Sequence, residues 1–477
     1  ARAVNAAGSS SNSPTGTVTT TGGAPGTPPV LGAIAAQSAT VNEDFEYTVT
    51  ATTTEGDPIL SYACTSAVST NVWEFDSQSG YLYFLPQSAQ IGANVFSFTA
   101  TDKDGACSPV AMTVTVSAAS TPPTVSFGAS RVYGEEGGAT VTLPVNLSFA
   151  ADATVQVAMA GTALPGGVDF TCANTTLVFS ASGSASSNLL FTVAEDGSAE
   201  GPESASLRLN PVAFATLGSV TQAVFLIRDN DAFSILAGNI TSGSNQEYEE
   251  PGERILETLC PDVALLQEFL MTNGVTYRAW VNEHFGSNFY YYVESTNGDS
   301  AAAIPNGIVS RWPITASNEW EDANLSNRDF AWAKIDLPGA RDLHAVSVHL
   351  KADSGYESDR TAQARALTNH ITTNGWLTNG YVVIGGDFNL QNRSETALSV
   401  LTAQVVSDAR QPADQFGDKD TNSGRDNPYD LVLPSTNLNA RHRSFTCYGY
   451  TFTNGMVFDT RIAWASGLPP PAQPNDS

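Results

Sequence analysis

Polar side chains that can do acid–base chemistry follow a short apolar run in the second half of the chain. In YVVIGGDFNL, the run stops at two glycines and is followed by Asp387 and Asn389. A run of this kind indicates a buried strand, and α/β proteins keep their chemistry just past such strands. An aspartate at this position also serves as a turn former or a helix cap, so the motif alone does not establish an active site.

Three other apolar runs place a titratable side chain at or near a strand end. PDVALLQEF ends its run before Glu268, and NPYDLVL begins its run at Asp430. In LHAVSVHL, the two-residue period of a strand puts His349 and His344 on opposite faces. Carboxylate oxygens bind hard divalent cations, and positioned donors stabilise charge on phosphoryl oxygens. Together these positions predict a site for a divalent cation and a phosphate group.

These motifs, together with ILAGNIT, which carries Asn239, and GIVSRWPI, which carries Arg311, follow one another in a familiar order. Over residues 233–477 the chain resembles the endonuclease/exonuclease/phosphatase superfamily typified by DNase I. The resemblance implies a four-layer α/β sandwich with two central sheets. It also implies a cleft in which Mg²⁺ or Mn²⁺ assists the hydrolysis of a phosphoester.

The resemblance assigns a role to each residue that ends or follows a strand. Glu268 would hold the metal, and Asn239 would fix the network of metal-bound or phosphate-bound groups beside it. Asp387 would orient or deprotonate the attacking water. These roles are chemically consistent, because a water nucleophile needs a nearby base.

The remaining positions would act on the phosphate. Asn389 and His349 would donate to phosphoryl oxygens, and Asp430 would orient a second histidine near the C-terminus. Arg311 either adds a further phosphate donor or braces the fold by ion pairing. No histidine follows His442, which precedes the last predicted strands. The pattern therefore predicts a domain that lacks its last strand and, in this form, hydrolyses poorly.

The first half of the chain has the composition of β-sandwich modules, with short alternating runs at regular spacing. Residues 1–29 resemble the end of a fibronectin type III domain and a linker, which predicts that the chain is an internal piece of a longer protein. Residues 30–118 resemble a cadherin-like or Ig-like module, and residues 119–232 a Calx-β domain. The predicted fold class is two all-β sandwiches followed by an α/β four-layer sandwich of DNase I type.

Acidic residues gather near the predicted ends of both β-modules. They either bind Ca²⁺ or form turns and a solvated acidic rim. The candidates in the Calx-β-like module are Glu135, Glu136, Asp196, Asp229 and Asp231. Those in the preceding module are Glu43, Asp57, Asp102 and Asp104.

Two helices are predicted, one ahead of the strand that leads to Glu268 and one ahead of the strand that leads to Asp387. In PGERILETLCPDV, Pro251 opens a helix that Pro261 closes. In TAQARALTNHITTNG, Ala364 and Leu367 face the core, and Gly375 follows the helix end. Helices in these places predict α/β layers.

The five cysteines leave several arrangements open. Cys64 and Cys107 lie in one module and form either a disulfide or two thiols. Cys172, Cys260 and Cys447 lie in or near apolar runs and are predicted to be buried thiols unless Cys260 meets Cys447. No cysteine has the spacing of a metal ligand.

The charge balance limits the possible partners. The chain has 21 Lys and Arg against 48 Asp and Glu, a net charge of −27, and no basic run. This composition disfavours a tight, processive nucleic-acid binder. It permits a distributive nuclease, and equally an enzyme acting on small esters. No apolar run is long enough to span a membrane.

The sequence therefore predicts a secreted or cell-surface, metal-dependent phosphoesterase with a nucleic acid or another phosphoester as substrate. A nuclease is the first choice, and a phosphodiesterase or phosphatase on small esters or lipid headgroups is the alternative. A further alternative is a Ca²⁺-stiffened structural or adhesive protein that self-associates or attaches to a cell surface through its β-modules. In that case the phosphoesterase fold would be a non-catalytic scaffold.

Overall fold

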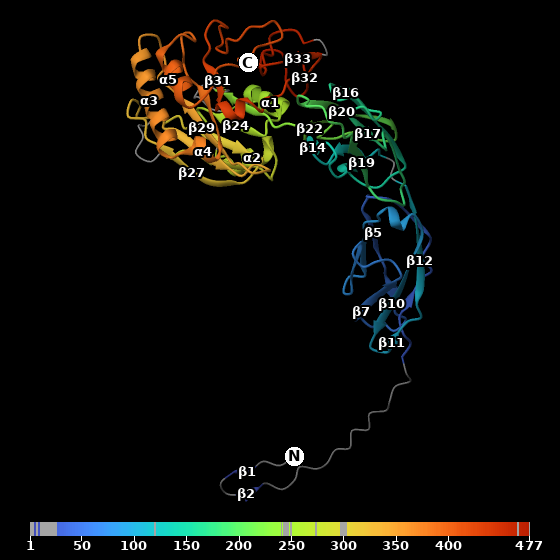
Figure 1. Cartoon of the computed structure of the whole chain (residues 1–477). Helices are drawn as coiled ribbons and strands as arrows, with labels where there is room; N and C mark the ends of the chain where they lie inside the picture. Colours follow the sequence, from blue (N-terminus) through green and yellow to red (C-terminus); the bar gives the residue numbers. More distant parts are fainter. Residues whose placement is uncertain are drawn as a thin grey trace.

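The computed structural model describes residues 4–5, 8–9, 26–118, 121–239, 241, 248, 250–271, 274–295, 303–464 and 467–476. Two β-rich modules and a C-terminal α/β domain follow one another in space (Figure 1). This confirms the predicted multidomain order. Near the N-terminus, β1 (Val4–Asn5) pairs antiparallel with β2 (Gly8–Ser9). The rest of the predicted fibronectin-like end and most of its linker lie outside the described residues.

The first module is built from short strands around an aromatic core. Phe84, Phe96 and Phe98 are fully buried, and β10 pairs with both β7 and β12. Cys64 and Cys107 are free thiols, so the disulfide alternative is wrong for this structure. The strands are β3 (Val30–Leu31), β4 (Gln37–Thr40), β5 (Phe45–Thr48), β6 (Ala51–Thr52), β7 (Ser61–Ser66), β8 (Trp73–Asp76), β9 (Tyr81–Phe84), β10 (Gly92–Asp102), β11 (Gly105–Ala106) and β12 (Val110–Ser117).

The second module has two five-stranded sheets, in the orders β17-β19-β15-β13-β21 and β14-β22-β20-β16-β18. Alternating apolar side chains of both sheets meet in one core, where Phe191 stacks on Phe225 at 4.4 Å between ring centroids. The strands are β13 (Thr124–Phe127), β14 (Arg131–Glu135), β15 (Val141–Leu147), β16 (Ala153–Gly161), β17 (Phe170–Cys172), β18 (Thr176–Phe179), β19 (Ser186–Val193), β20 (Glu203–Ala213), β21 (Thr216–Leu217) and β22 (Gln222–Arg228).

The C-terminal domain contains two central sheets. The four-stranded sheet has the order β23-β24-β26-β25, and the five-stranded sheet has the order β27-β28-β29-β30-β31. Their strands are β23 (Ile235–Gly238), β24 (Val263–Leu266), β25 (Tyr290–Val293), β26 (Gly307–Ser310), β27 (Ile314–Trp320), β28 (Phe330–Ile335), β29 (Leu343–His349), β30 (Tyr381–Asp387) and β31 (Asp430–Pro434). A hairpin of β32 (Phe445–Cys447) and β33 (Tyr450–Phe452) follows.

Helices cover the outer faces of both sheets. Leu265 and Ala345 belong to the core between the sheets, whereas Leu256 packs outside the first sheet and Leu367 outside the second. The helices are α1 (Glu250–Leu259), α2 (Tyr277–His284), α3 (Glu357–Thr373), α4 (Trp376–Asn379), α5 (Thr396–Gln404) and α6 (Thr436–Asn439). No helix in the described part of the chain is long and apolar enough to cross a membrane.

Both predicted helices form, with shifted starts. The helix α1 begins one residue before Pro251, and α3 begins at Glu357, four residues before the predicted segment. Gly375 follows α3 with a φ of +67°, as its predicted place past the helix end requires. Cys260 and Cys447 are buried free thiols, and Cys172 is a partly buried one.

The second β-module packs directly on the C-terminal domain, as Figure 1 shows where β14 and β22 approach it. Arg228, at the end of β22, donates to the carbonyl of Phe285 at 2.9 Å, and its guanidinium lies 5.0 Å from the Phe289 ring centroid. The hydroxyl of Tyr133 donates to the carbonyl of His284 at 3.1 Å. These contacts fix the module against the domain.

Candidate active site

Five of the residues singled out in the sequence meet at one end of the two sheets. Asn239 follows β23, and Glu268 lies two residues past β24. His349 ends β29, and Asp387 ends the parallel neighbour β30. Asp430 begins the antiparallel strand β31 and pairs directly with Asp387. Parallel strands share one carboxyl end, and β31 enters at that end, so the topology gathers side chains that are far apart in the sequence.

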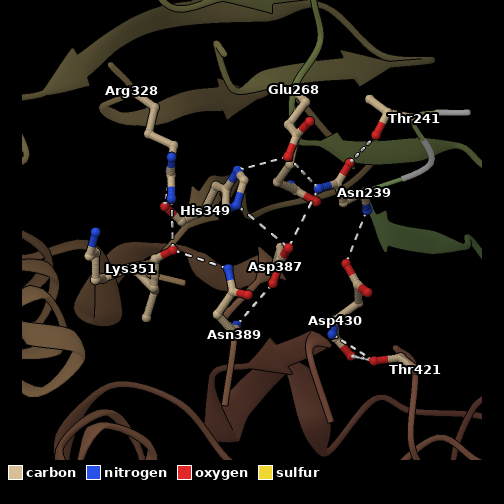
Figure 2. A network of polar contacts seen from close by, with 12 residues as sticks. Asn239, Thr241, Glu268, Arg328, His349, Lys351, Asp387, Asn389, Thr421 and Asp430 are labelled. Atoms are coloured by element: carbon tan, nitrogen blue, oxygen red, sulfur yellow. Dashed lines mark hydrogen bonds and ion pairs between the residues drawn. The ribbon is translucent and has the colours of Figure 1, made fainter. Parts of the chain in front are cut away.

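Asn239 connects the carboxylates of the site (Figure 2). Its side-chain nitrogen Nδ2 donates to Glu268 Oε1 at 2.9 Å and lies 3.5 Å from Asp387 Oδ2. Its backbone N–H donates to Asp430 Oδ1 at 3.0 Å, and the Thr241 hydroxyl donates to its Oδ1 at 3.1 Å. Asn239 thus contacts three acids, two through its side-chain amide and one through its backbone N–H.

His349 faces two of these acids without forming a close pair. Its Nδ1 is 3.9 Å from Glu268 Oε1, and its Nε2 is 3.6 Å from Asp387 Oδ2. The buried Nδ1 has no hydrogen-bond partner among the residues that the structure describes. Burial, and then the charge of Arg328, hold the pKa of His349 well below its usual value. The imidazole is therefore neutral at neutral pH and retains one N–H to donate.

Two residues of the site have a backbone angle that few non-glycine residues adopt. Glu268 and Asn389 both have a φ of +52°. Non-glycine residues rarely adopt this left-handed region, and such strain is concentrated at functional sites. Asn389 is fixed there, because its N–H donates to Asp387 Oδ1 at 2.9 Å and its Nδ2 donates to the carbonyl of Leu350 at 3.2 Å.

The three acids crowd negative charge into a buried space. Burial raises the pKa of Asp387 to about 6, and the charge of Glu268 acts in the same direction. Burial also raises the pKa of Glu268, and burial together with Asp387 holds that of Asp430 well above its usual range. Uncompensated carboxylates beside an imidazole nitrogen without a partner are a donor set that fits a hard divalent cation.

The two glycines before Asp387 let the sheets and strands approach closely. A side chain on Gly385 would place its Cβ 2.6 Å from a methyl group of Leu265 in the other sheet. A Cβ on Gly386, whose φ is +139°, would overlap the carbonyl oxygen of Val348 and lie 2.6 Å from Gln267 Nε2. The Gly-Gly pair therefore sets the position of the catalytic strand end.

Gly386→Ala is expected to destabilise the C-terminal domain by at least about 1–3 kcal/mol, because both the backbone angle and the space are unsuitable for a side chain. Thermal unfolding followed by circular dichroism measures the effect. Gly197→Ala is the matched control, since a Cβ there meets nothing within 4 Å. Equal stability of the two variants would contradict the packing described for β30.

Arg328 is a site residue that the sequence did not single out. It is 7% exposed, and its Nε donates to the carbonyl of His349 at 2.8 Å. Burial lowers its pKa, while the charges of Asp387 and Glu268 act in the opposite direction. The motif around it, SNRDF, is a polar segment before a strand and has no distinctive signal.

Arg311 is placed at the other end of the first sheet, next to the start of β24. Its guanidinium pairs with Asp262 at 3.0 Å and with Glu135 of the second β-module at 2.7 Å. Of the two roles predicted for Arg311, the structure shows the ion pairing that braces the fold. The alternative role as a phosphate donor is corrected, because these pairs hold the guanidinium at the opposite end of the sheet. This contact also ties the module to the domain.

Asp430 has no imidazole partner among the described residues. The other four histidines lie elsewhere: His284 pairs with Glu257 at 2.7 Å, His344 stacks on Trp376, His370 stacks on Trp320, and His442 lies near Arg410. Asp430 instead bonds the backbone of Asn239 and, through its own N–H, the Thr421 hydroxyl at 2.7 Å.

The acids proposed for Ca²⁺ only partly come together. Glu136, Asp229 and Asp231 each offer a carboxylate oxygen within 4.8 Å of one another. Burial, and then Asp229, raise the pKa of Glu136 to about 7, with a smaller effect of Asp196. Glu135 points away from this group, to Arg311. Ca²⁺ at this end of the module stays a prediction.

In the first module a different set of acids gathers. Asp57 and Asp104 lie together with Glu55, which the sequence did not single out. Lys103 pairs with Asp57 and Asp104 at 2.8 Å each, and therefore already supplies a cation. Glu43 and Asp102 are not members of this group. Asp102 instead accepts the N–H of Asp104 at 2.8 Å in a turn, as the turn alternative predicted.

Comparisons with known proteins agree with this architecture. Residues 235–456 match the Endonuclease/Exonuclease/phosphatase family, and residues 26–115 match a bacterial Ig domain. The C-terminal domain is thus of the predicted superfamily, and the Ig alternative holds for the first module. Two sphingomyelinase C sequences from Bacillus cereus are 33% identical over 111 residues, which is 21% of this chain and 32% of theirs. The chain therefore spans about a third of the length of these curated relatives.

Similar solved structures cover two parts of the chain. Sphingomyelinase C from Streptomyces griseocarneus is 18% identical, over 46% of this chain and 95% of that chain, with a TM-score of 0.33. The apo form of the Calx CBD1 domain is 20% identical, over 23% of this chain and 99% of that chain, with a TM-score of 0.21. The Calx-β and cadherin assignments stay predictions. The family match points to a hydrolase that acts on phosphoesters.

Proposed function

We propose that the C-terminal domain hydrolyses phosphodiesters with the help of a divalent cation, and that its substrate is a lipid headgroup diester. The observation that carries the reaction type is the convergence of Glu268, Asp387 and Asn239 with the donors His349 and Asn389 at one end of the sheets. This set contains a base, cation ligands and donors for a phosphoryl group, as hydrolysis by water requires.

Glu268 and Asn239 are the residues that would hold Mg²⁺ or Mn²⁺. When bound, such a cation would neutralise the negative charge on the phosphoryl oxygens. The residues fit this role because Glu268 is a buried carboxylate with a raised pKa, and the bond from Asn239 Nδ2 to its oxygen Oε1 at 2.9 Å orients it. Oxygen ligands of this type are those that Mg²⁺ and Mn²⁺ prefer.

Asp387 is the base in this proposal. Its Oδ1 accepts the backbone N–H of Asn389, and its Oδ2 faces His349 and Asn239, so the carboxylate is held in one orientation. In the ionised form it accepts a proton from a water molecule that attacks phosphorus. A carboxylate oriented on both oxygens places that water reproducibly.

His349 and Asn389 bind the phosphoryl oxygens. Asn389 uses one N–H of its amide on the carbonyl of Leu350 and has a second N–H to donate. The neutral His349 donates through one ring nitrogen. Donors fixed before the substrate arrives stabilise the charge that grows on phosphoryl oxygens during attack.

The charge of the chain supports a headgroup substrate over a nucleic acid. A net charge of −27 repels a long polyanion, whereas a zwitterionic headgroup has no net charge to repel. The partial identity to sphingomyelinase C supports the same substrate class. The Ig-type module at residues 26–115 supports the prediction of a secreted or cell-surface protein.

A substrate panel tests the proposal. The full chain is incubated with sphingomyelin vesicles, bis-p-nitrophenyl phosphate or plasmid DNA, each with Mg²⁺, Mn²⁺ or EDTA. With metal we expect slow release of the phosphomonoester headgroup and of p-nitrophenol, because Asp430 has no imidazole partner among the described residues. With EDTA we expect none. Cleavage of DNA without headgroup release would contradict the substrate class and favour the nuclease. No hydrolysis of any substrate would contradict the reaction itself and favour the scaffold alternative.

A further inference from the structure

Arg328 lies just before β28 and bonds the backbone at the end of β29. Its Nε donates to the carbonyl of His349 at 2.8 Å, and its Nη2 donates to the carbonyl of Leu350 at 3.1 Å. Its Nη1 donates to the side chain of Asn327 at 3.2 Å. Figure 2 shows the guanidinium directed toward the segment that carries His349 and Lys351. This geometry spans two consecutive carbonyls with one rigid group.

Arg328 differs from the other deeply buried arginine nearby. Arg360 is fully buried and forms a two-bond pair with Glu395 at 2.8 and 2.9 Å. Among the described residues, no carboxylate oxygen lies within 4.0 Å of the Arg328 guanidinium. Burying a guanidinium without a carboxylate partner costs several kcal/mol, so stability alone does not account for this residue.

The carbonyl of Leu350 links Arg328 to the phosphate donors. It accepts from Arg328 Nη2 and also from Asn389 Nδ2, at 3.1 and 3.2 Å. The N–H of Leu350 donates to the backbone carbonyl of Asp387 at 2.8 Å. Through the carbonyl of His349 and the backbone of Leu350, Arg328 is connected to three residues of the site: His349, Asn389 and Asp387.

We propose that Arg328 is a positioning residue, which fixes the 349–350 backbone so that His349 and Asn389 aim their donors at the phosphoryl group. This role rests on the proposed function of the site. Displacement of donors by a fraction of an ångström weakens the stabilisation of the transition state more than the binding of the substrate. The effect of losing Arg328 therefore falls on kcat.

The test compares Arg328→Lys with Arg278→Lys in the full chain. Lysine keeps the charge but cannot reach both carbonyls, because its ammonium is a single point. Arg278 is the matched control, since its guanidinium also donates to a backbone carbonyl, that of Phe289 at 2.8 Å, outside the site. We expect kcat of Arg328→Lys to fall by about 10–100-fold with KM little changed, and Arg278→Lys to retain its kcat.

A second readout does not depend on activity. The side-chain amide resonance of Asn389, assigned through the loss of its signal in Asn389→Asp, is compared between the wild-type chain and both lysine variants. We expect it to shift in Arg328→Lys and to stay in place in Arg278→Lys. A shift in a chain that hydrolyses nothing would support the positioning role while contradicting the proposed function. An unshifted amide with an unchanged kcat in Arg328→Lys would overturn the role.

Discussion

Replacing Asp387 by asparagine is expected to lower phosphodiester hydrolysis by about 10²–10⁴-fold, because the substitution removes the base and keeps the shape of the side chain. The hydrogen bond from the Asn389 N–H is retained by the amide oxygen, so the local backbone should stay in place. Initial rates with bis-p-nitrophenyl phosphate and Mg²⁺ measure the loss. The control is Asp342→Asn, at the opposite end of the same sheet, where Asp342 pairs with the partly exposed Lys334.

The same substitution is expected to stabilise the protein in EDTA. The pKa of Asp387 is raised to about 6 in the folded protein from an ordinary value of 3.8, chiefly by burial. A raised pKa contributes stability that is present below about pH 4 and is lost as the pH rises through about 6. Asparagine has no charge to develop. The melting temperature of Asp387→Asn should therefore exceed that of the wild-type chain at pH 7 and match it at pH 3.5. A lower value at pH 7 would contradict this account of the buried acids.

Replacing Arg360 by methionine is expected to destabilise the C-terminal domain by about 3–5 kcal/mol, because it leaves the Glu395 carboxylate buried without its partner. The variant also loses bonds from Arg360 Nη1 to the carbonyls of Lys351 and Asp353, both 2.9 Å, which hold the loop after β29. Urea unfolding followed by tryptophan fluorescence measures the change.

Two comparisons separate the ion pair from the loss of side-chain packing. The double variant Arg360→Met/Glu395→Met should recover part of the stability, because apolar replacement of both partners removes the stranded charge. Lys334→Met breaks the exposed pair with Asp342 and should change stability by about 0–1 kcal/mol. A double variant less stable than Arg360→Met would show that the pair is not the source of the effect.

The positions of the acids were predictable because a strand and its end are specified by neighbouring residues in the sequence. The apolar run before Asp387 and the alternation along β29 each specify which side chains leave the sheet at its edge. The alternation held in detail: Ser347 donates to the carbonyl of Leu266 in the other sheet, whereas Val346 and Val348 pack in the core under α3 and α5. The family resemblance then implied two central sheets with a cleft for these side chains.

The roles of Arg328 and Arg311 depend on contacts with residues distant in the sequence, which no local pattern predicts. The acceptors of Arg328 are backbone carbonyls 21 and 22 residues away, and a carbonyl is the same in every residue. The role of Arg311 was decided by its place at the far end of β26 and by Glu135, which belongs to another module. Tertiary contacts of this kind become visible only once the sheets and modules are placed.

The central claim is that Asp387 directs a water molecule onto the phosphorus atom of a diester. The most direct measurement is hydrolysis of sphingomyelin in water enriched in heavy oxygen, with Mg²⁺, followed by mass spectrometry of the phosphomonoester product. The account predicts one heavy oxygen atom on phosphorus in each product molecule from the wild-type chain, and product from Asp387→Asn at a rate about 10²–10⁴-fold lower. Product without heavy oxygen on phosphorus, or equal product from both chains, would contradict it.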